Sequence, residues 1–159
     1  MKSIKKTALL ILIACILLFF GYYRDFVFKN INALLKAWDA DMDFKMPPSL
    51  FFLENYDYDT LVNIKWLLTI LFSFIYLSIA IITIQLLFNN KKHIRVTVLS
   101  YLAITIVSGV FILTGYFFQN TSEKMYEFAR YLMGMAQSPI VLMLLIPAFK
   151  LSEKENSEK

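Results

Sequence analysis

The stretch Glu127-Phe-Ala-Arg-Tyr-Leu-Met-Gly-Met-Ala-Gln-Ser-Pro139 opens the last hydrophobic segment of the chain and carries charge well into it. Polar and small side chains recur in it at steps of three and four, which places them along one side of a helix. We call this set the polar stripe, and its members are Glu127, Arg130, Gly134, Gln137 and Ser138. Lipid tails do not solvate such side chains. The sequence therefore predicts that neighbouring helices or a partner protein cover the stripe.

The composition around this stretch is that of a membrane protein. Of 159 residues, 58% are hydrophobic and 18% are charged, whereas a soluble domain is roughly 45–50% apolar. The excess lies in long uninterrupted runs, as in membrane spans. The net charge of +4 comes without a block of Lys and Arg interleaved with aromatic residues, so we expect no nucleic-acid partner.

The apolar runs predict an all-α polytopic protein, with one membrane domain over residues 1–159. Tyr22, Tyr23 and Arg24 form an interface anchor after the first run, which lacks a cleavage site and is expected to stay in place. The four transmembrane helices are expected at residues 8–23, 61–88, 96–118 and 125–149, with a tight polar turn at 119–124.

Residues 12–15, Leu-Ile-Ala-Cys, are similar to the lipobox that precedes a lipidated cysteine in bacterial lipoproteins. Such a cysteine is followed by a polar tether, whereas an apolar run, Ile16-Leu-Leu-Phe-Phe20, follows here. A spanning helix is the simpler interpretation, and the lipidation of Cys15 stays open.

Residues 24–60 form the sizeable loop between the first two spans. Apolar residues recur in it at helical spacing, opposite charged ones, which predicts an amphipathic helix. This helix either lies along the membrane surface or packs on the ends of the bundle. Its apolar positions are Phe26, Ile31, Leu34, Leu35, Trp38 and Met42.

Candidate metal and catalytic sets are incomplete. Asp39, Asp41 and Asp43 resemble the start of a calcium loop, but Phe44 and Leu50 stand where an EF-hand needs Gly and Glu. His93 is the single histidine and neighbours three cations, so we expect a solvated loop residue. With one cysteine and one histidine in unlike surroundings, we expect no enzyme, no cofactor and no metal.

The distribution of Lys and Arg predicts the orientation. The N-terminus, the turn at residues 89–95 and the tail at residues 150–159 hold nine of these cations, against four in the loop and one in the turn at 119–124. By the positive-inside rule, both termini are cytoplasmic and the loop is extracytoplasmic. The charged tail has little to bury and is expected to be disordered.

In that orientation, Arg24 and Asp25 lie at a depth similar to that of Glu127 and Arg130. Either a Glu127–Arg130 pair or a crosswise set of all four would neutralise these charges. Pro139 leaves the carbonyl of Met135 without its usual donor, and Ser138 or Gln137 is expected to replace it.

Three roles for the polar stripe remain open on these grounds. It packs the last helix into the bundle, it docks a partner, or it lines a path for a substrate or ion.

The small size, the anchor ending in Tyr-Tyr-Arg-Asp25 and the last helix, Arg130-Tyr-Leu-Met-Gly-Met-Ala-Gln-Ser-Pro139, together resemble the small exosortase-associated membrane proteins of bacteria. The resemblance covers about a third of the chain. It implies a companion of a membrane-embedded processing enzyme in the bacterial inner membrane, a non-enzymatic subunit that docks a larger integral membrane protein. The alternative is a small carrier or channel subunit that uses the stripe.

Overall fold

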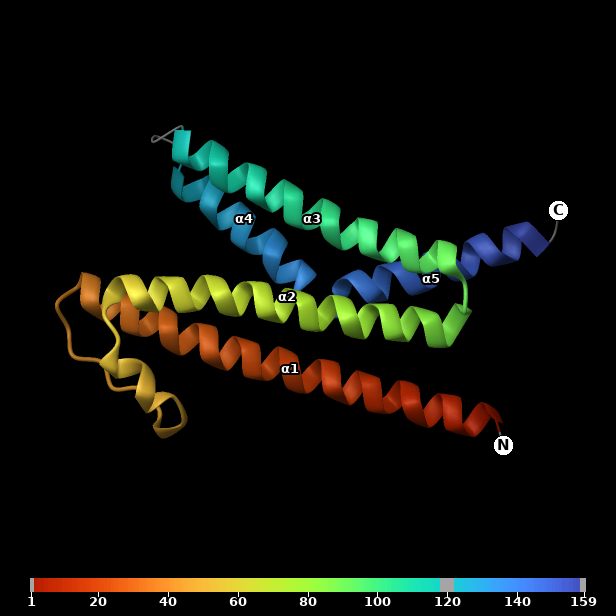
Figure 1. Cartoon of the computed structure of the whole chain (residues 1–159), viewed down its shortest axis with the longest axis horizontal. Helices are drawn as coiled ribbons and strands as arrows, with labels where there is room; N and C mark the ends of the chain where they lie inside the picture. The colour runs from red at the N-terminus through yellow and green to blue at the C-terminus, as the bar shows by residue number, and fades with distance from the viewer. Residues whose placement is uncertain (1, 118–121, 158–159) are drawn as a thin grey trace. The chain divides into compact units, whose positions relative to one another are not determined.

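The computed structural model describes residues 2–117 and 122–157, and the regular structure of these residues is entirely helical, without strands (Figure 1). The all-α prediction is therefore confirmed. The elements are α1 (Lys2–Asp39), the 3-10 helix η1 (Pro48–Asn55), α2 (Tyr58–Phe88), α3 (Lys91–Phe117), α4 (Ser122–Ala136) and α5 (Ile140–Ser157). Of the turn expected at residues 119–124, residues 119–121 lie outside the described residues, and residues 122–124 instead belong to the first turn of α4.

Three helices, α1 to α3, are long and apolar enough to cross a membrane, and α4 with α5 meets the same criterion as one bent pair. The protein is accordingly a multi-pass membrane protein. The chain divides into two compact units. The bundle unit comprises Met1–Leu17 and Ser73–Lys159, and the loop unit comprises Leu18–Phe72.

Helix α1 does not end at the predicted interface anchor. It continues unbroken to Asp39, so the expected amphipathic segment is the end of α1 and not a separate helix. Arg24 and the residues after it are compatible with helix, and nothing breaks the backbone there. The helix ends where Asp41 adopts a left-handed φ of 51°. The Met42 amide then donates to the Ala37 carbonyl and the Asp41 amide to that of Trp38, a Schellman-type end.

The apolar side of the α1 segment in the loop unit builds that unit's core. Val27, Ile31 and Leu34 are buried there, together with Met46 and Leu50 from the loop and η1. The segment thus packs on other elements of the loop unit, while its place along the membrane surface or on the ends of the bundle stays a prediction. Two of the predicted apolar positions are not part of this core, since Trp38 is 52% exposed and Met42 is 66% exposed.

The link between α2 and α3 is shorter than the basic turn expected at residues 89–95. Only Asn89 and Asn90 lie outside the helices. Asn89 takes a left-handed φ of 48°, and the Asn90 side chain accepts the Lys92 amide at 2.9 Å. This cap starts α3 five residues before the predicted span.

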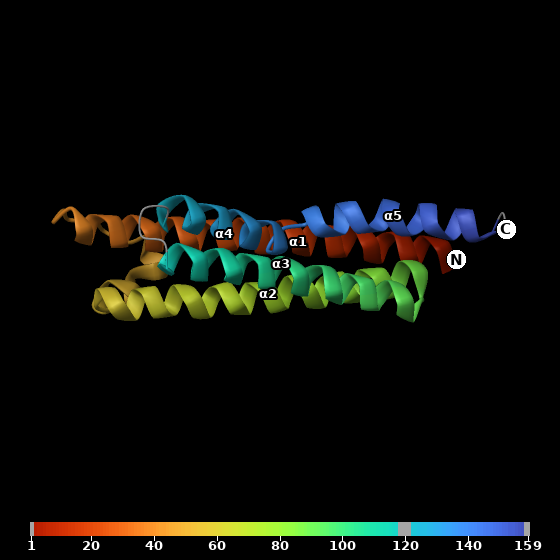
Figure 2. The same ribbon diagram turned by 90° about the horizontal axis from the view of Figure 1, so that it is seen from above.

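Within the bundle unit, α3 and α4 lie side by side (Figure 1, Figure 2). The buried Ser108 hydroxyl of α3 donates to the Ala129 carbonyl of α4 at 2.9 Å. The Phe111 and Phe128 rings meet edge to face at 4.7 Å. A small polar side chain thus joins the two helices where their backbones approach closely.

The last span expected over residues 125–149 is broken into α4 and α5, and the bent pair still meets the criterion for one span. The segments Lys124–Ala136 and Ile140–Glu155 are bent by 58° at this break. Pro139 supplies no amide for the carbonyl four residues earlier, which explains the break at this place.

The tail is not disordered as expected at residues 150–157. Helix α5 continues through it to Ser157. Lys and Glu, which make up half of residues 150–157, are good helix formers. Glu153 also contacts α3 through His93.

Candidate functional site

The C-terminal end of the polar stripe, at Gln137 and Ser138, lies in the bundle unit, where Gln137 is buried. Gln137 is 2% exposed, and its Nε2 donates to the Ser73 hydroxyl of α2 at 2.9 Å. Ser73 is four residues after Thr69, whose hydroxyl bonds to its own helix at the Lys65 carbonyl. Gln137 therefore joins the last membrane segment to α2, as the packing role of the stripe predicts.

Ser138 repairs the backbone at the break. Its hydroxyl donates to the Met135 carbonyl at 2.8 Å, which confirms the predicted replacement for the donor lost at Pro139. The same oxygen lies 3.4 Å from the Ile140 amide at the start of α5. One side chain thus serves the end of α4 and the beginning of α5, as backbone groups at membrane depth require.

The N-terminal end of the stripe is exposed. Glu127 and Arg130 are both exposed on α4, while Gly134 is half-buried. The predicted Glu127–Arg130 pair does not form among the residues that the structure describes, where Arg24 instead pairs with its neighbour Asp25. The side of α4 that packs inward carries Ala129 and Ala136, each 1% exposed.

Arg24 and Asp25 belong to the loop unit, where the pair spans 2.9 Å. The Arg24 guanidinium also lies 5.5 Å from the centre of the Phe28 ring, one helical turn further on. The crosswise set with Glu127 and Arg130 would join the two units and stays a prediction.

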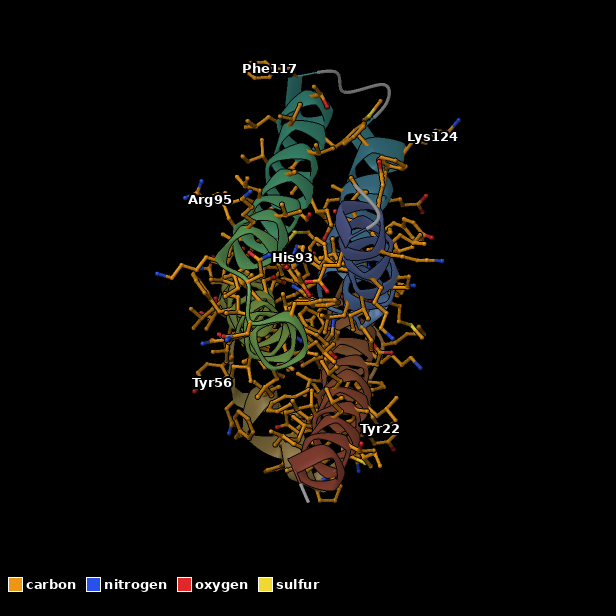
Figure 3. All side chains as sticks on the ribbon, turned by 90° about the vertical axis from the view of Figure 1, so that its right-hand side faces the viewer. Tyr22, Tyr56, His93, Arg95, Phe117 and Lys124 are labelled. Carbon is orange, nitrogen blue, oxygen red and sulfur yellow. The ribbon has the colours of Figure 1, made fainter. Side chains whose placement is uncertain are left out.

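His93 is not the solvated loop residue that the sequence suggested. It is 8% exposed, its ring stacks on Phe149 at 4.4 Å and meets Phe88 edge to face at 5.2 Å. Its Nε2 lies 3.2 Å from Oε1 of Glu153. His93 lies near the start of α3 (Figure 3), and its ring contacts α5 through Phe149. Phe88 and Phe149, at the ends of apolar runs, were the sequence signal that could have indicated a buried histidine. The contact with Glu153, however, requires α5 to continue beyond Phe149.

A buried hydroxyl was also missed. Tyr101 on α3 is 4% exposed, and its hydroxyl has no hydrogen-bond partner among the described residues. Tyr76 on α2 is fully buried, and its hydroxyl donates to the Leu17 carbonyl at 3.3 Å. The sequence placed both tyrosines inside apolar runs and offered no sign that they are interior.

The acidic loop carries a pocket of about 390 Å³ in the loop unit. Asp41, Asp43 and Glu54 line it beside Trp38 and other apolar side chains. In the described ranges, no three His, Cys, Asp or Glu side chains gather as metal ligands. Glu54 instead accepts the Met46 amide, which fastens the loop to the end of η1.

Comparisons of the chain with protein-family models, with curated proteins and with solved structures find no match. The arrangement itself divides the stripe into a buried end that joins helices and an exposed charged end.

Proposed function

We propose that the protein is a non-enzymatic accessory subunit of the bacterial inner membrane that docks a larger integral membrane protein. In this proposal the chain crosses the membrane four times, with α4 and α5 together as the last span. Both termini are cytoplasmic, and residues 40–57 with the end of α1 are extracytoplasmic. The positive-inside distribution of Lys and Arg supports this orientation.

The observation that carries the proposal is the exposure of Glu127 and Arg130 on α4. A charged side chain facing lipid costs roughly 2.5–3.5 kcal/mol at the helix centre on insertion scales, and less toward the end of the span, where these two residues lie. The cost falls when the charge meets a partner of opposite sign or lies near the interface. Since the two residues do not pair with each other within the described chain, a partner helix with matching charges is the simplest cover. Such a pair contributes specificity of assembly more than stability.

The resemblance of the last segment to exosortase-associated proteins indicates the class of partner. A membrane-embedded enzyme that processes C-terminal sorting signals is the partner we propose. The stripe would be the docking face, and the outer loop would add a second contact.

The test is a pull-down of the tagged protein from its native membrane in a mild detergent. Wild type is compared with Arg130→Ala and with the control Lys150→Ala, which removes an exposed cation on α5 away from the stripe. One stoichiometric membrane partner, retained by the control and lost with Arg130→Ala, is the expected result. Recovery of the protein without a membrane partner, or with copies of itself alone, would sink the proposal.

The helix break favours a second candidate, a small carrier or channel subunit. Broken helices at membrane depth in transporters lie where protein or a water-filled path replaces lipid, and α4 and α5 are bent by 58°. This candidate predicts flux of a solute or ion through the purified protein in liposomes. Substitution of Arg130 or Glu127 would change that flux. Absence of flux through liposomes that contain the protein would exclude this second candidate.

A further inference from the structure

A second pocket lies in the bundle unit, where the first turns of α3 meet α5. Its volume is about 490 Å³, within the range of roughly 300–1,000 Å³ of small-molecule sites. Its lining includes a cation, an anion, a hydroxyl and an apolar wall, namely Lys92, Glu153, Ser152, Val96 and Phe149, with His93 behind them.

The anion of the pocket is held in place. Because a carboxylate accepts hydrogen bonds and does not donate them, the Nε2–H of His93 donates to Glu153 at 3.2 Å. The imidazole is itself fixed between Phe149 and Phe88. Glu153 nevertheless keeps 48% of its side chain exposed, so that part of the carboxylate remains available to a ligand.

The cation of the pocket comes from the first turn of α3. The Lys92 backbone is anchored by the Asn90 cap at 2.9 Å, while its side chain is exposed. The ammonium therefore reaches into solvent from a fixed backbone position.

The apolar wall connects the pocket to the lipid phase. Val96 follows Lys92 by one helical turn and is 44% exposed, and α3 is a candidate membrane span from Lys91 onward. The pocket consequently lies at the level where a span leaves the hydrocarbon and meets the lipid headgroups.

We propose that this pocket binds the headgroup of a phospholipid that carries both a phosphate and a primary ammonium, as phosphatidylethanolamine does. Glu153 receives the ammonium, Lys92 receives the phosphate, and an acyl chain follows Val96 toward the membrane interior. A headgroup with a phosphate and no amine leaves Glu153 unmatched. A choline headgroup lacks the N–H donors that form charge-assisted hydrogen bonds with a carboxylate. This site is independent of the partner proposed above.

The test uses the full chain in nanodiscs of phosphatidylcholine that contain equal small fractions of phosphatidylethanolamine and phosphatidylglycerol. Native mass spectrometry counts the lipids that remain bound on release. We expect phosphatidylethanolamine to be retained roughly tenfold or more over the other two, the effect of one charge-assisted hydrogen bond. Glu153→Gln should abolish the preference, and Lys92→Gln should lower the retention of all three lipids alike, because each of them carries a phosphate. Glu155→Gln and Lys91→Gln remove charges of the same sign next to the pocket, and both variants should bind the lipids as the wild type does.

Equal retention of the three lipids, a preference for phosphatidylglycerol, or an unchanged preference in Glu153→Gln would overturn the proposal. Soluble glycerophosphoethanolamine distinguishes a free phosphate compound from a lipid. If it displaces the bound lipid at an equal concentration, the lipid is not the ligand. Glu153→Gln alters the contact with His93 as well as ligand binding. Lys92 is exposed, so Lys92→Gln tests the phosphate contact without disturbing the packing of α3 on α5.

Discussion

The hydrogen bond from Gln137 to Ser73 should contribute measurably to the stability of the bundle unit. It spans 2.9 Å from nitrogen to oxygen, and Gln137 is 2% exposed. Interhelical hydrogen bonds of this kind in membranes contribute about 0.6 kcal/mol on average and up to about 1.7 kcal/mol. The geometry and burial place this bond in the upper half, so we expect a coupling energy of about 1 kcal/mol.

A double-mutant cycle isolates that coupling. Wild type, Gln137→Ala, Ser73→Ala and the double variant are unfolded reversibly by SDS in mixed micelles, followed by far-UV circular dichroism. The sum of the single losses should exceed the loss in the double variant by the coupling energy. Packing lost with the Gln137 side chain cancels in the cycle.

The matched control is a second double-mutant cycle, in which Ser78→Ala takes the place of Ser73→Ala. Ser78 is also on α2, is exposed, and its hydroxyl bonds to the Phe74 carbonyl of its own helix. Its coupling to Gln137 should be zero within error. A Gln137–Ser73 coupling below about 0.3 kcal/mol, or one equal to the control, would refute the assignment of the C-terminal end of the stripe to packing.

Three further outcomes follow from other residues. Arg130→Ala should leave the free energy of unfolding within about 0.5 kcal/mol of wild type in the same SDS titration, because Arg130 is exposed. A loss above about 1 kcal/mol would mean that the Arg130 side chain stabilises the bundle unit itself. Asp41→Gly should raise the stability by about 1 kcal/mol and Asp41→Val should lower it, because the left-handed φ of 51° suits glycine; equal values would contradict this. The hydrogen bond from the Thr60 hydroxyl lowers the pKa of Asp57 below its ordinary value of 3.8. The Asp57 carboxylate, which accepts the Thr60 amide at the start of α2, therefore caps the helix fully above pH 3.8. This cap weakens as acid protonates the carboxylate in the folded protein. Helicity followed from about pH 6 to about pH 2 should fall in wild type more than in Asp57→Asn.

The membrane helices were predictable because a span is a local property. A run of apolar residues of sufficient length determines it without any knowledge of tertiary contacts. The repair at Pro139 was predictable for the same reason: the missing donor and the nearby hydroxyl of Ser138 lie within one turn.

The end of α1 was not predictable from its interface anchor. Tyr22, Tyr23 and Arg24 are suited to the level where the membrane ends, but none of them stops a helix. Helix α1 ends at Asp39, and the left-handed φ of Asp41 and the prolines Pro47 and Pro48 follow it. An interface signature and a helix terminus are thus different signals.

The contact of His93 with Glu153 joins residues far apart in the sequence, and no local pattern announces it. It requires α5 to continue through a charged segment whose composition suggested disorder. The division of the polar stripe was equally hidden, because periodicity treats residues 125–149 as one straight helix. Gln137 is buried against Ser73 of α2 whereas Arg130 is exposed, a difference that depends on which neighbouring helix lies beside each residue.

The break between α4 and α5 has a consequence for how the chain enters the membrane. Helix α4 has 15 residues, which rise only about 22 Å against a hydrocarbon thickness of about 30 Å, and it carries Glu127 and Arg130. Its insertion alone is unfavourable. The apolar α3, joined to α4 through Ser108 and Ala129, must already be in place to receive it. The last span is therefore expected to enter late during synthesis, as half of a hairpin, and to wait in the insertion machinery until α3 can pair with it.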